Sequence, residues 1–323
     1  MLPSVLPTET DHVPVLADEV LAALAPRQGD TIVDCTFGAG GHSALLAARL
    51  RGEGKLIAID RDPTVAPFFE RFRRETRVKS RLHHGEFSDV LQRLAGNGVQ
   101  ADAILLDLGV SSMQIDRPDR GFSYAVDAPL DMRMDPSAEL TASDLVNEAS
   151  ERDLADIFRR LGEERYARPI ARAIVARRRT QPFERTGDLV EVVKAAIPAP
   201  ARFGEGHPAK RVFQALRIVV NDELGALEDG LEHALAMLRP GGRVAVISFH
   251  SLEDRIVKTF FRDAARGCIC PPDLPICGCG HEPLLRVLTP RVVRPNEIEV
   301  EDNPRAASAR LRVAERTAAE LPQ

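Results

Sequence analysis

The chain has 323 residues, 44% of them hydrophobic, and a formal net charge of −5. Its length and apolar content favour one large α/β domain with a smaller one and exclude wholesale disorder, while the negative charge argues against binding nucleic acid through bulk charge. No stretch approaches the roughly 18 apolar residues of a membrane span, and residues 1–12 lack the features of a secretory signal, so we expect a cytoplasmic chain with no membrane partner.

Short apolar runs predict the strands of a sheet. Most of them lack clean alternation, which is typical of strands buried on both faces. They cover residues 31–36, 55–60, 102–108 and 243–249, with a weaker run at 80–87. Helical patterns at 43–50 and 88–98 lie between them. This alternation indicates right-handed crossovers in a doubly wound, Rossmann-like parallel sheet, and therefore an α/β fold.

The alternation stops after residue 112. No strand pattern follows up to about residue 208, where a loop-like stretch gives way to helical segments at 141–162, 164–179 and 186–197. Thr141 and Thr186 are predicted N-caps, and Asp144 stands where a capping box needs an acid. We therefore expect an inserted all-helical domain, residues 113–207, within a sheet domain formed by residues 1–112 and 208–323.

The C-terminal part of the sequence returns to the sheet pattern. A long helix is predicted over residues 209–238, directly before the strand at 243–249. Two further strands are predicted at 284–293 and 308–317, separated by an acidic segment that contains prolines. These two strands fit an antiparallel hairpin that completes the sheet.

A glycine-rich turn follows the first strand. Asp34 ends that strand, Gly38, Gly40 and Gly41 follow, and a helix begins near Ser43. Glycines allow a tight bend and let a ligand lie against bare peptide N–H groups. The turn therefore predicts a site for a nucleotide-like ligand, although NAD enzymes share this arrangement.

Acids at the ends of further strands sharpen this interpretation. Asp60 ends the second strand, where a carboxylate can accept both ribose hydroxyls, and Asp107 ends the strand at 102–108. The string GAGGHS lacks the third glycine of the NAD signature, and the turn contains no P-loop. The carboxylate of Asp34 would repel a pyrophosphate but attract the cationic end of S-adenosylmethionine, so we favour the latter ligand.

Two basic segments and four clustered cysteines each leave two interpretations open. Residues 71–81 and 167–179 either steer a phosphate backbone or are solvated helix faces. The C-x-C…C-x-C segment either closes a thiolate zinc site or is a loop with reduced thiols, and we assign no metal ligand from the sequence. It contains Cys268, Cys270, Cys277 and Cys279.

Eight strings together resemble the ribosomal RNA small subunit methyltransferase H family, also called MraW. They are DCTFGAGGHS, AIDRDP, LLDLGVSS, RGFS, PLDMRMD, GEERYARPIARAIV, SFHSLEDRIVK and NPRAASARLR. The resemblance covers about residues 10–317 and implies a class I methyltransferase sheet with an inserted helical domain. It implies methyl transfer from S-adenosylmethionine to N4 of a cytidine in the decoding centre of small-subunit (16S) ribosomal RNA, either as RNA or within the assembled small subunit.

The resemblance also implies site residues. The cofactor positions of the family fall on Gly40, Gly41, His42, Asp60, Phe87, Asp107 and Gln114, with the ring of Phe87 expected to pack on adenine. The inserted helices, which carry Arg168, Arg172 and Arg177–Arg179, are the expected RNA platform. The target cytidine would have to be splayed out of structured RNA into a pocket.

The sequence offers two candidates for the proton acceptor at N4. The lone pair of that amine is delocalised into the ring, so an acceptor for its proton would help. DNA amino-methyltransferases have an Asp/Ser/Asn-Pro-Pro-aromatic string after the fourth strand, whereas this chain has DLGVSS. We hypothesise that Asp131 or His250 contacts the base. Several arginines are expected either to contact phosphates or to form local salt bridges: Arg133, Arg255, Arg305 and Arg310.

Three alternative functions remain open on the sequence. The chain could methylate a small molecule, bind cofactor as a catalytically silent scaffold on ribosomes or the division apparatus, or act as an NAD oxidoreductase. The inserted basic helices argue against the first and the glycine spacing against the third. The oligomeric state also stays open, with a homodimer as one alternative.

Overall fold

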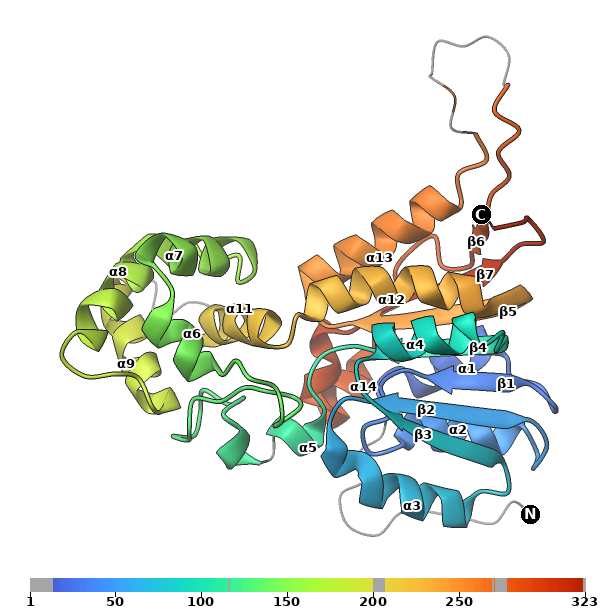
Figure 1. Ribbon diagram of the computed structural model, residues 1–323, viewed down its shortest axis with the longest axis horizontal. Coiled ribbons are helices and arrows are strands. Elements are labelled where there is room, and N and C mark those ends of the chain that lie inside the picture. Colours follow the sequence, from blue (N-terminus) through green and yellow to red (C-terminus); the bar gives the residue numbers. More distant parts are fainter. Residues whose placement is uncertain (1–13, 116, 200–206, 269, 271–277, 322–323) are drawn as a thin grey trace. The chain divides into compact units, whose positions relative to one another are not determined.

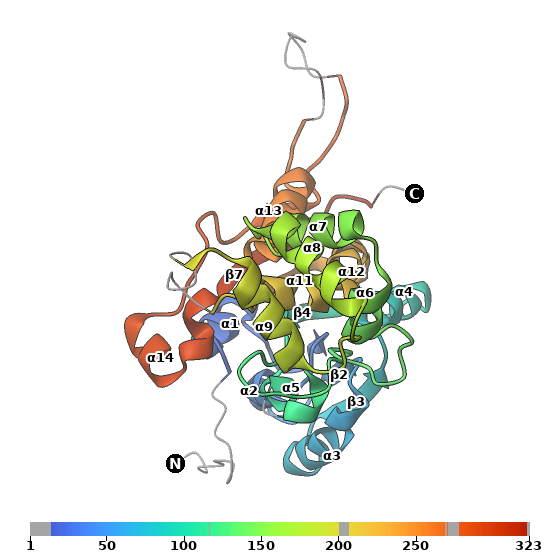
Figure 2. The same ribbon diagram turned by 90° about the vertical axis from the view of Figure 1, so that its left-hand side faces the viewer.

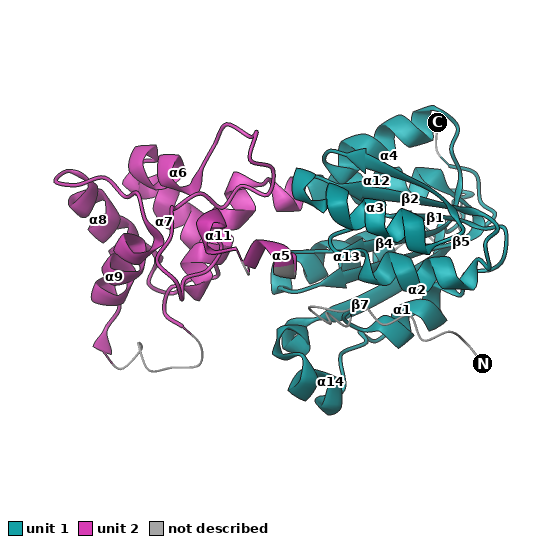
Figure 3. Cartoon of the chain, turned by 90° about the horizontal axis from the view of Figure 1, so that it is seen from below, with its two compact units in different colours: residues 1–109, 226–323 teal, residues 110–225 magenta. Residues whose placement is uncertain are grey.

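A computed structural model describes residues 14–115, 117–199, 207–268, 270 and 278–321. The chain forms two compact units, one made of residues 1–109 and 226–323 and the other of residues 110–225 (Figure 3). The first unit contains a sheet with helices on both faces. The described elements of the second unit are helices, with one antiparallel β-bridge between Pro129 and Arg185.

The sheet of the first unit has seven strands in the order β3-β2-β1-β4-β5-β7-β6 (Figure 1). The strands from β1 to β5 pair in parallel, whereas β7 is antiparallel to both of its neighbours, β5 and β6. This is the class I methyltransferase sheet, so the predicted fold class is confirmed. The strands are β1 (Thr31–Asp34), β2 (Lys55–Asp60), β3 (Lys79–His84), β4 (Ala101–Asp107), β5 (Leu238–Ser248), β6 (Leu285–Val287) and β7 (Arg310–Arg316).

Helices cover both faces of this sheet (Figure 1). One face carries α4 (Phe87–Gly96), α12 (Glu223–Met237) and α13 (Ser251–Ala264), and the other carries α1 (Ala17–Leu24), α2 (Gly41–Arg49) and α3 (Ala66–Glu75), which follows the short η1 (Pro63–Val65). Residues of β4 point alternately to the two layers, and Ile104, Leu105 and Leu106 are all fully buried. Burial on both sides explains why this strand reads as a continuous apolar run.

The C-terminal hairpin contains more structure than the sequence pattern predicts. The antiparallel pairing of β6 with β7 confirms the hairpin. The acidic connection, for which no element was predicted, contains α14 (Glu297–Asp302) and η3 (Pro304–Ser308). Asn296 caps α14 by accepting a hydrogen bond from the backbone N–H of Glu299 at 2.9 Å, and Asn303 caps η3 by accepting from the N–H of Arg305.

The second unit is a helical cluster with its own core (Figure 2). Leu154 and Phe158 of α7, Ile170 and Ile174 of α8 and Leu189 of α9 are all fully buried in it. The elements are α5 (Ser112–Ile115), η2 (Pro118–Arg120), α6 (Ala142–Glu148), α7 (Glu151–Arg160), α8 (Ala167–Arg178), α9 (Thr186–Ala196) and α11 (Lys210–Val220). None of the helices in the described residues is long and apolar enough to cross a membrane.

Two predicted helices are each divided in two. The segment at 141–162 forms α6 and α7, because Ser150 N-caps α7 by accepting from the N–H of Asp153 at 3.1 Å. The segment at 209–238 forms α11 and α12, separated where Asp222 adopts a left-handed φ of 46°. The second unit therefore extends to Gly225 and includes α11, which packs on α6 and α7, whereas the predicted inserted segment ended at residue 207.

One of the two predicted N-caps of this unit is confirmed. Thr141 and Asp144 form a reciprocal capping box at the start of α6. The prediction for Thr186 was wrong, because Arg185 occupies the cap position and Thr186 is the first helical residue. The Thr186 hydroxyl instead accepts from the N–H of Ala128 at 3.0 Å and donates to the carbonyl of Val126 at 2.9 Å, so it ties the preceding loop to α9.

Candidate active site

The carboxyl ends of β2, β1 and β4 form a notch in the sheet of the first unit. Asp34, the last residue of β1, pairs with Ala58 on one side and with Leu105 on the other. β2 and β4 each continue two residues further, to Asp60 and Asp107. The central strand therefore stops short between two carboxylates, at the point where the strand order of the sheet reverses, which is where open α/β sheets bind ligands.

The turn after β1 is tied to both neighbouring strands. Gly38 donates its N–H to Oδ2 of Asp60 at 2.8 Å, and Asp62 donates to Oδ1 of the same carboxylate at 2.8 Å. On the other side, Asp107 donates its N–H to the hydroxyl of Thr36 at 2.7 Å. Burial raises the pKa of Asp60 to about 6, in spite of the two N–H donors, which lower it. Asp60 is thus held rigidly, with its remaining lone pairs available to a hydroxyl donor.

Gly40 allows this turn to close. It adopts a left-handed φ of 82° as the residue before α2, and a Cβ atom there would lie 2.7 Å from Cζ of Phe37. A side chain at position 40 would therefore be both strained and blocked. Gly41 begins α2 and packs against Pro14, so the predicted glycine turn leads directly into the N-terminus of a helix.

Asp34 does not have the role expected from the sequence. Only 1% of its surface is exposed, its Oδ2 accepts a hydrogen bond from the Ser43 hydroxyl at 2.6 Å, and its Oδ1 accepts from the N–H of Thr36 at 3.1 Å. Burial raises its pKa, and the bond from Ser43 opposes this effect. Asp34 therefore links β1, the turn and α2, and it is too deeply buried to meet a cationic ligand.

His42 lies between the N-terminal segment and Asp107. Its Nε2 is 3.0 Å from the carbonyl oxygen of Val15, which can only accept, so Nε2 carries a proton. Its Nδ1 is 3.5 Å from Oδ2 of Asp107. Burial raises the pKa of Asp107 to about 6, and the nearby His42 opposes this shift.

Oδ1 of Asp107 is relevant to whether the notch fits the expected cofactor. Oδ1 of Asp107 is buried and has no hydrogen-bond partner within the described residues. Such an atom is costly unless a donor reaches it. S-adenosylmethionine carries ribose hydroxyls, an amino group on adenine and an ammonium group, all of them donors. The notch offers the unsatisfied Oδ1 of Asp107 and the carboxylate of Asp60, both beside a glycine-rich turn. These residues therefore fit S-adenosylmethionine.

Phe87 and Gln114, two of the predicted cofactor residues, belong to different units of the chain. Phe87 begins α4, and its ring packs so closely on α12 that a Cβ at Gly230 would lie 2.4 Å from Cε2. Gln114 belongs to the second unit, is 5% exposed, and accepts a hydrogen bond from the N–H of Ser111 through Oε1 at 3.0 Å. The predicted cofactor contacts of both residues stay predictions.

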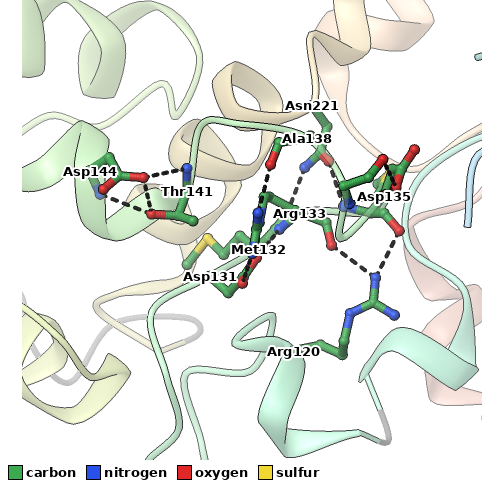
Figure 4. A network of polar contacts seen from close by, with 11 residues as sticks. Arg120, Asp131, Met132, Arg133, Asp135, Ala138, Thr141, Asp144 and Asn221 are labelled. Atoms are coloured by element: carbon green, nitrogen blue, oxygen red, sulfur yellow. Dashed lines mark hydrogen bonds and ion pairs between the residues drawn. The ribbon is translucent and has the colours of Figure 1, made fainter.

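Asp131 belongs to a tightly ordered loop of the second unit (Figure 4). Arg133 donates to it from Nε at 2.9 Å and from Nη2 at 2.7 Å, which is a bidentate pair, and its backbone N–H donates to Oδ1 at 2.9 Å. Burial by itself would raise the pKa of Asp131, but the bonds from Arg133 outweigh it, so the pKa is lowered. Asp131 therefore stays ionised and can accept hydrogen bonds at neutral pH.

Two side chains hold this loop, residues 129–138, from either side (Figure 4). Arg120 donates from Nη2 to the carbonyls of Arg133 and Met134 at 2.9 and 2.8 Å. Asn221 accepts from the N–H of Met134 at 2.7 Å and donates to the carbonyl of Met132 at 2.8 Å. This bracing stabilises the left-handed φ of 63° at Met132, which costs free energy in a residue with a side chain.

His250 is the N-cap of α13 in the first unit. Its Nδ1 accepts from the N–H of Glu253 at 3.4 Å, and the Glu253 carboxylate accepts from the N–H groups of Phe249 and His250 at 2.8 and 3.1 Å. This capping box is a structural role that the sequence pattern did not indicate. It leaves the catalytic role of His250 as an untested prediction.

The arginines divide by the partners that the structure gives them. Arg133 and Arg310 form local ion pairs, with Asp131 and Asp254 respectively. On α8, Arg178 donates to the carbonyl of Val146 at 2.7 Å and Arg177 interacts with Gln181 and the ring of Phe183. Three arginines of the same segment have exposed side chains, Arg168, Arg172 and Arg179, and Nε of Arg172 lies 3.7 Å from Oε1 of Glu151.

Three residues of the notch were missed in the sequence. They are Val15, whose carbonyl orients His42, and Thr36 and Ser43, which hold Asp107 and Asp34. Thr36 and Ser43 lie within the string DCTFGAGGHS, so their hydroxyls were a usable signal. The part played by Val15 is a backbone contact and leaves no trace in residue type.

Comparisons with known proteins agree with this architecture. A sequence model of the MraW methylase family matches residues 9–317, which span both units. The ribosomal RNA small subunit methyltransferase H of Heliobacterium modesticaldum is 53% identical over 313 residues, which cover 94% of this chain and 98% of that protein. The proteins of the same name from Symbiobacterium thermophilum and Geobacter sulfurreducens are 54% and 52% identical, covering 93% and 94% of this chain and 95% and 98% of their own lengths.

Proposed function

The chain belongs to the MraW methylase family, and from this premise we propose that it methylates N4 of a cytidine in the decoding centre of small-subunit ribosomal RNA. The observation that carries the proposal is the match of the family over both units, together with relatives named as ribosomal RNA small subunit methyltransferases. The substrate is the RNA itself or the assembled small subunit.

The first unit supplies the cofactor site. The chain uses S-adenosylmethionine, which provides an electrophilic methyl group when bound. Asp60 accepts donors at one side of the notch and Asp107 at the other, while the turn at Gly40 keeps side chains away from the ligand. We assign Gly41, His42, Phe87 and Gln114 to the same cofactor site. Rigid positioning of this kind is a large part of methyl transfer, because it replaces a rare encounter with a prepared geometry.

The second unit supplies the RNA platform in this proposal. Its exposed arginines on α8 and at the C-cap of that helix suit phosphate contacts, which orient the RNA without reading its sequence. The braced loop at 129–138 presents the ionised Asp131, which can accept a hydrogen bond from the N4 amino group. Such an acceptor makes the nitrogen lone pair more available, although the lowered pKa makes Asp131 a weak base. His250 is retained as the alternative contact with the base.

Mapping of the modified nucleotide tests the substrate. Small subunits from a strain that lacks this enzyme are incubated with labelled cofactor and the purified chain, and the RNA is digested and analysed by mass spectrometry. We expect one added methyl group on a decoding-centre cytidine and none on small metabolites. Label on another atom, or no label on RNA or particle, contradicts the proposal.

An Asp131→Asn variant tests the catalytic assignment. We expect the rate at saturating cofactor to fall at least ~100-fold, the lower end of the range for a positioned acid–base group, with cofactor affinity unchanged. The matched control is Asp135→Asn, because Asp135 is an acid of the same loop whose carboxylate bonds locally to the N–H and hydroxyl of Ser137. A near-normal rate in Asp131→Asn removes this assignment.

A further inference from the structure

The cysteine segment between α13 and β6 places three sulfur atoms together. The Sγ atoms of Cys268, Cys270 and Cys279 all lie within 4.8 Å of one another. Sγ of Cys268 is 3.8 Å from Sγ of Cys279. The fourth cysteine of the segment, Cys277, lies outside the described residues.

The sulfur separation matches a tetrahedral metal site. Thiolates bind zinc at about 2.3 Å, and two sulfurs at that distance and at the tetrahedral angle are about 3.8 Å apart. A disulfide needs its sulfurs near 2.05 Å, far closer than the separation observed between Cys268 and Cys279. Two residues of a C-x-C pair and one from a position 11 residues away in the sequence thus converge with the spacing that zinc prefers.

The surroundings of the segment explain why it would need a metal. The backbone N–H of Leu284 donates to the carbonyl of Ala264, the last residue of α13, at 2.8 Å, which closes the base of the segment. Beyond that base, none of the described side chains between residues 265 and 283 is buried. Figure 1 draws the described arms extending from α13 and β6. Described arms that bury none of their own side chains require another source of stability, and metal ligation is one.

We propose that Cys268, Cys270 and Cys279 bind a zinc ion, which staples the two described arms, residues 265–268 and 278–283, to one another. Zinc suits this set because soft thiolates select it and because it requires no redox chemistry. The role is structural and separate from methyl transfer, since the cofactor notch uses none of these cysteines. Binding deprotonates the three thiols, so protons are released as the metal enters.

Metal analysis of the full-length chain, purified under reducing conditions from zinc-supplemented cells, tests this site. We expect about one zinc per chain by mass spectrometry, and loss of that zinc in Cys268→Ser, Cys270→Ser and Cys279→Ser. Cys35→Ala is the matched control, because Cys35 is buried in the sheet core and lies outside the cluster; it should keep the full zinc content. Zinc retained by all three serine variants overturns the proposal.

A second measurement needs no variant and so does not depend on their folding. Cobalt added to the metal-depleted wild-type chain should give the intense visible bands of tetrahedral thiolate coordination, and zinc should displace them. Zinc removal should also speed tryptic cleavage after Arg266, which is exposed within the segment. The absence of both metal and cobalt bands, or a freshly purified chain with Cys268 and Cys279 joined in a disulfide, contradicts the site.

Discussion

Nδ1 of His42 lies 3.5 Å from Oδ2 of Asp107, while Nε2 of the same ring is fixed by the carbonyl of Val15. The backbone of Val15 therefore orients a histidine whose presence lowers the pKa of a carboxylate at the end of β4. This pairing makes the charge of Asp107 depend on His42 near neutral pH.

A His42→Ala variant should weaken cofactor binding most strongly at low pH. Without His42 the pKa of Asp107 rises further above 6. The substitution therefore reduces the ionised fraction of Asp107 more at pH 6.5 than at pH 8.5. A rise of one unit corresponds to a loss of up to about tenfold in affinity at the lower pH. Calorimetric titration with S-adenosylmethionine at both values measures this; His233→Ala, on α12, is the control. A uniform loss across pH would argue for a purely steric role.

The raised pKa of Asp60 predicts how stability changes with pH. The folded chain keeps a proton on Asp60 up to about pH 6, whereas the unfolded chain releases it near its ordinary value of 3.8. Stability of the ligand-free chain therefore falls as pH rises through this window and does not change further above it on this account.

The comparison with Asp60→Asn isolates that effect. Relative to this variant, the wild-type chain should lose roughly 1–3 kcal/mol between pH 4 and pH 7. Denaturant unfolding at several pH values is the measurement, with Asp156→Asn, a change at a surface acid of α7, as the control. A stability difference between wild type and Asp60→Asn that stays constant over this range would contradict a raised pKa. Cofactor binding should show the opposite trend and tighten as pH rises through 6.

Gly121 and Gly98 form a matched pair for testing the braced loop. Both have a left-handed φ, 73° and 72°, but a Cβ at Gly121 would lie 2.3 Å from the carbonyl oxygen of Pro129, whereas none of the neighbouring described atoms lies within 4 Å at Gly98. Gly98→Ala should cost about 1–2 kcal/mol from backbone strain alone. Gly121→Ala should cost more, because the loop must also move. Equal losses in thermal unfolding would show that the close approach is unimportant.

His250 can be tested separately as a cap and as a catalytic group. Asparagine is a good N-cap and lacks an imidazole, whereas alanine lacks both functions. We expect His250→Ala to lower stability by about 0.5–2 kcal/mol and His250→Asn to lower it less. If His250 also contacts the base, both variants lose methyl-transfer rate. A normal rate in a stably folded His250→Asn would leave only the capping role.

The two basic segments should differ in RNA binding. On α3, Arg71 and Arg73 pair with Glu75 and Glu70, as expected of a solvated helix face. Alanine at Arg168, Arg172 and Arg179 should weaken binding to small-subunit RNA and reduce the salt dependence of the affinity, by up to about 0.7–0.9 in the log–log slope for each phosphate that is no longer neutralised. Alanine at Arg71, Arg73 and Arg74 is the control. Fluorescence anisotropy over a salt series distinguishes the two sets, and equal effects would contradict the platform assignment.

The sheet could be predicted because its central strands, β1, β4 and β5, are largely buried, and burial leaves a direct trace in residue type. Asp60 and Asp107 could also be predicted as site residues, since a strand end followed by a turn can be recognised from the local sequence. Roles that depend on distant partners left no such trace. Asn221 follows the last residue of α11, and its amide bonds to the backbone of Met132 and Met134. The helical pattern of residues 209–238 gives no sign of these contacts.

Local hydrogen bonds give Asp34 and His250 structural roles that the sequence did not indicate. Asp34 is a strand-end acid like Asp60 and Asp107, but it accepts a hydrogen bond from the hydroxyl of Ser43 and is buried. His250 follows a buried strand, which favours a catalytic interpretation, and yet it completes a capping box with Glu253. In both cases a partner a few residues away in the sequence decides the role of the side chain.

The position of β7 between β5 and β6 has a consequence for how the chain is made. Ribosomes synthesise the strands in numerical order, so the last of the seven to emerge is an internal one. Until residues 310–316 are available, β5 presents an unpaired edge with an apolar surface, which is a state prone to associate with other nascent chains. A chaperone that shields that edge during translation would therefore have more influence on the yield of this protein than on its final stability.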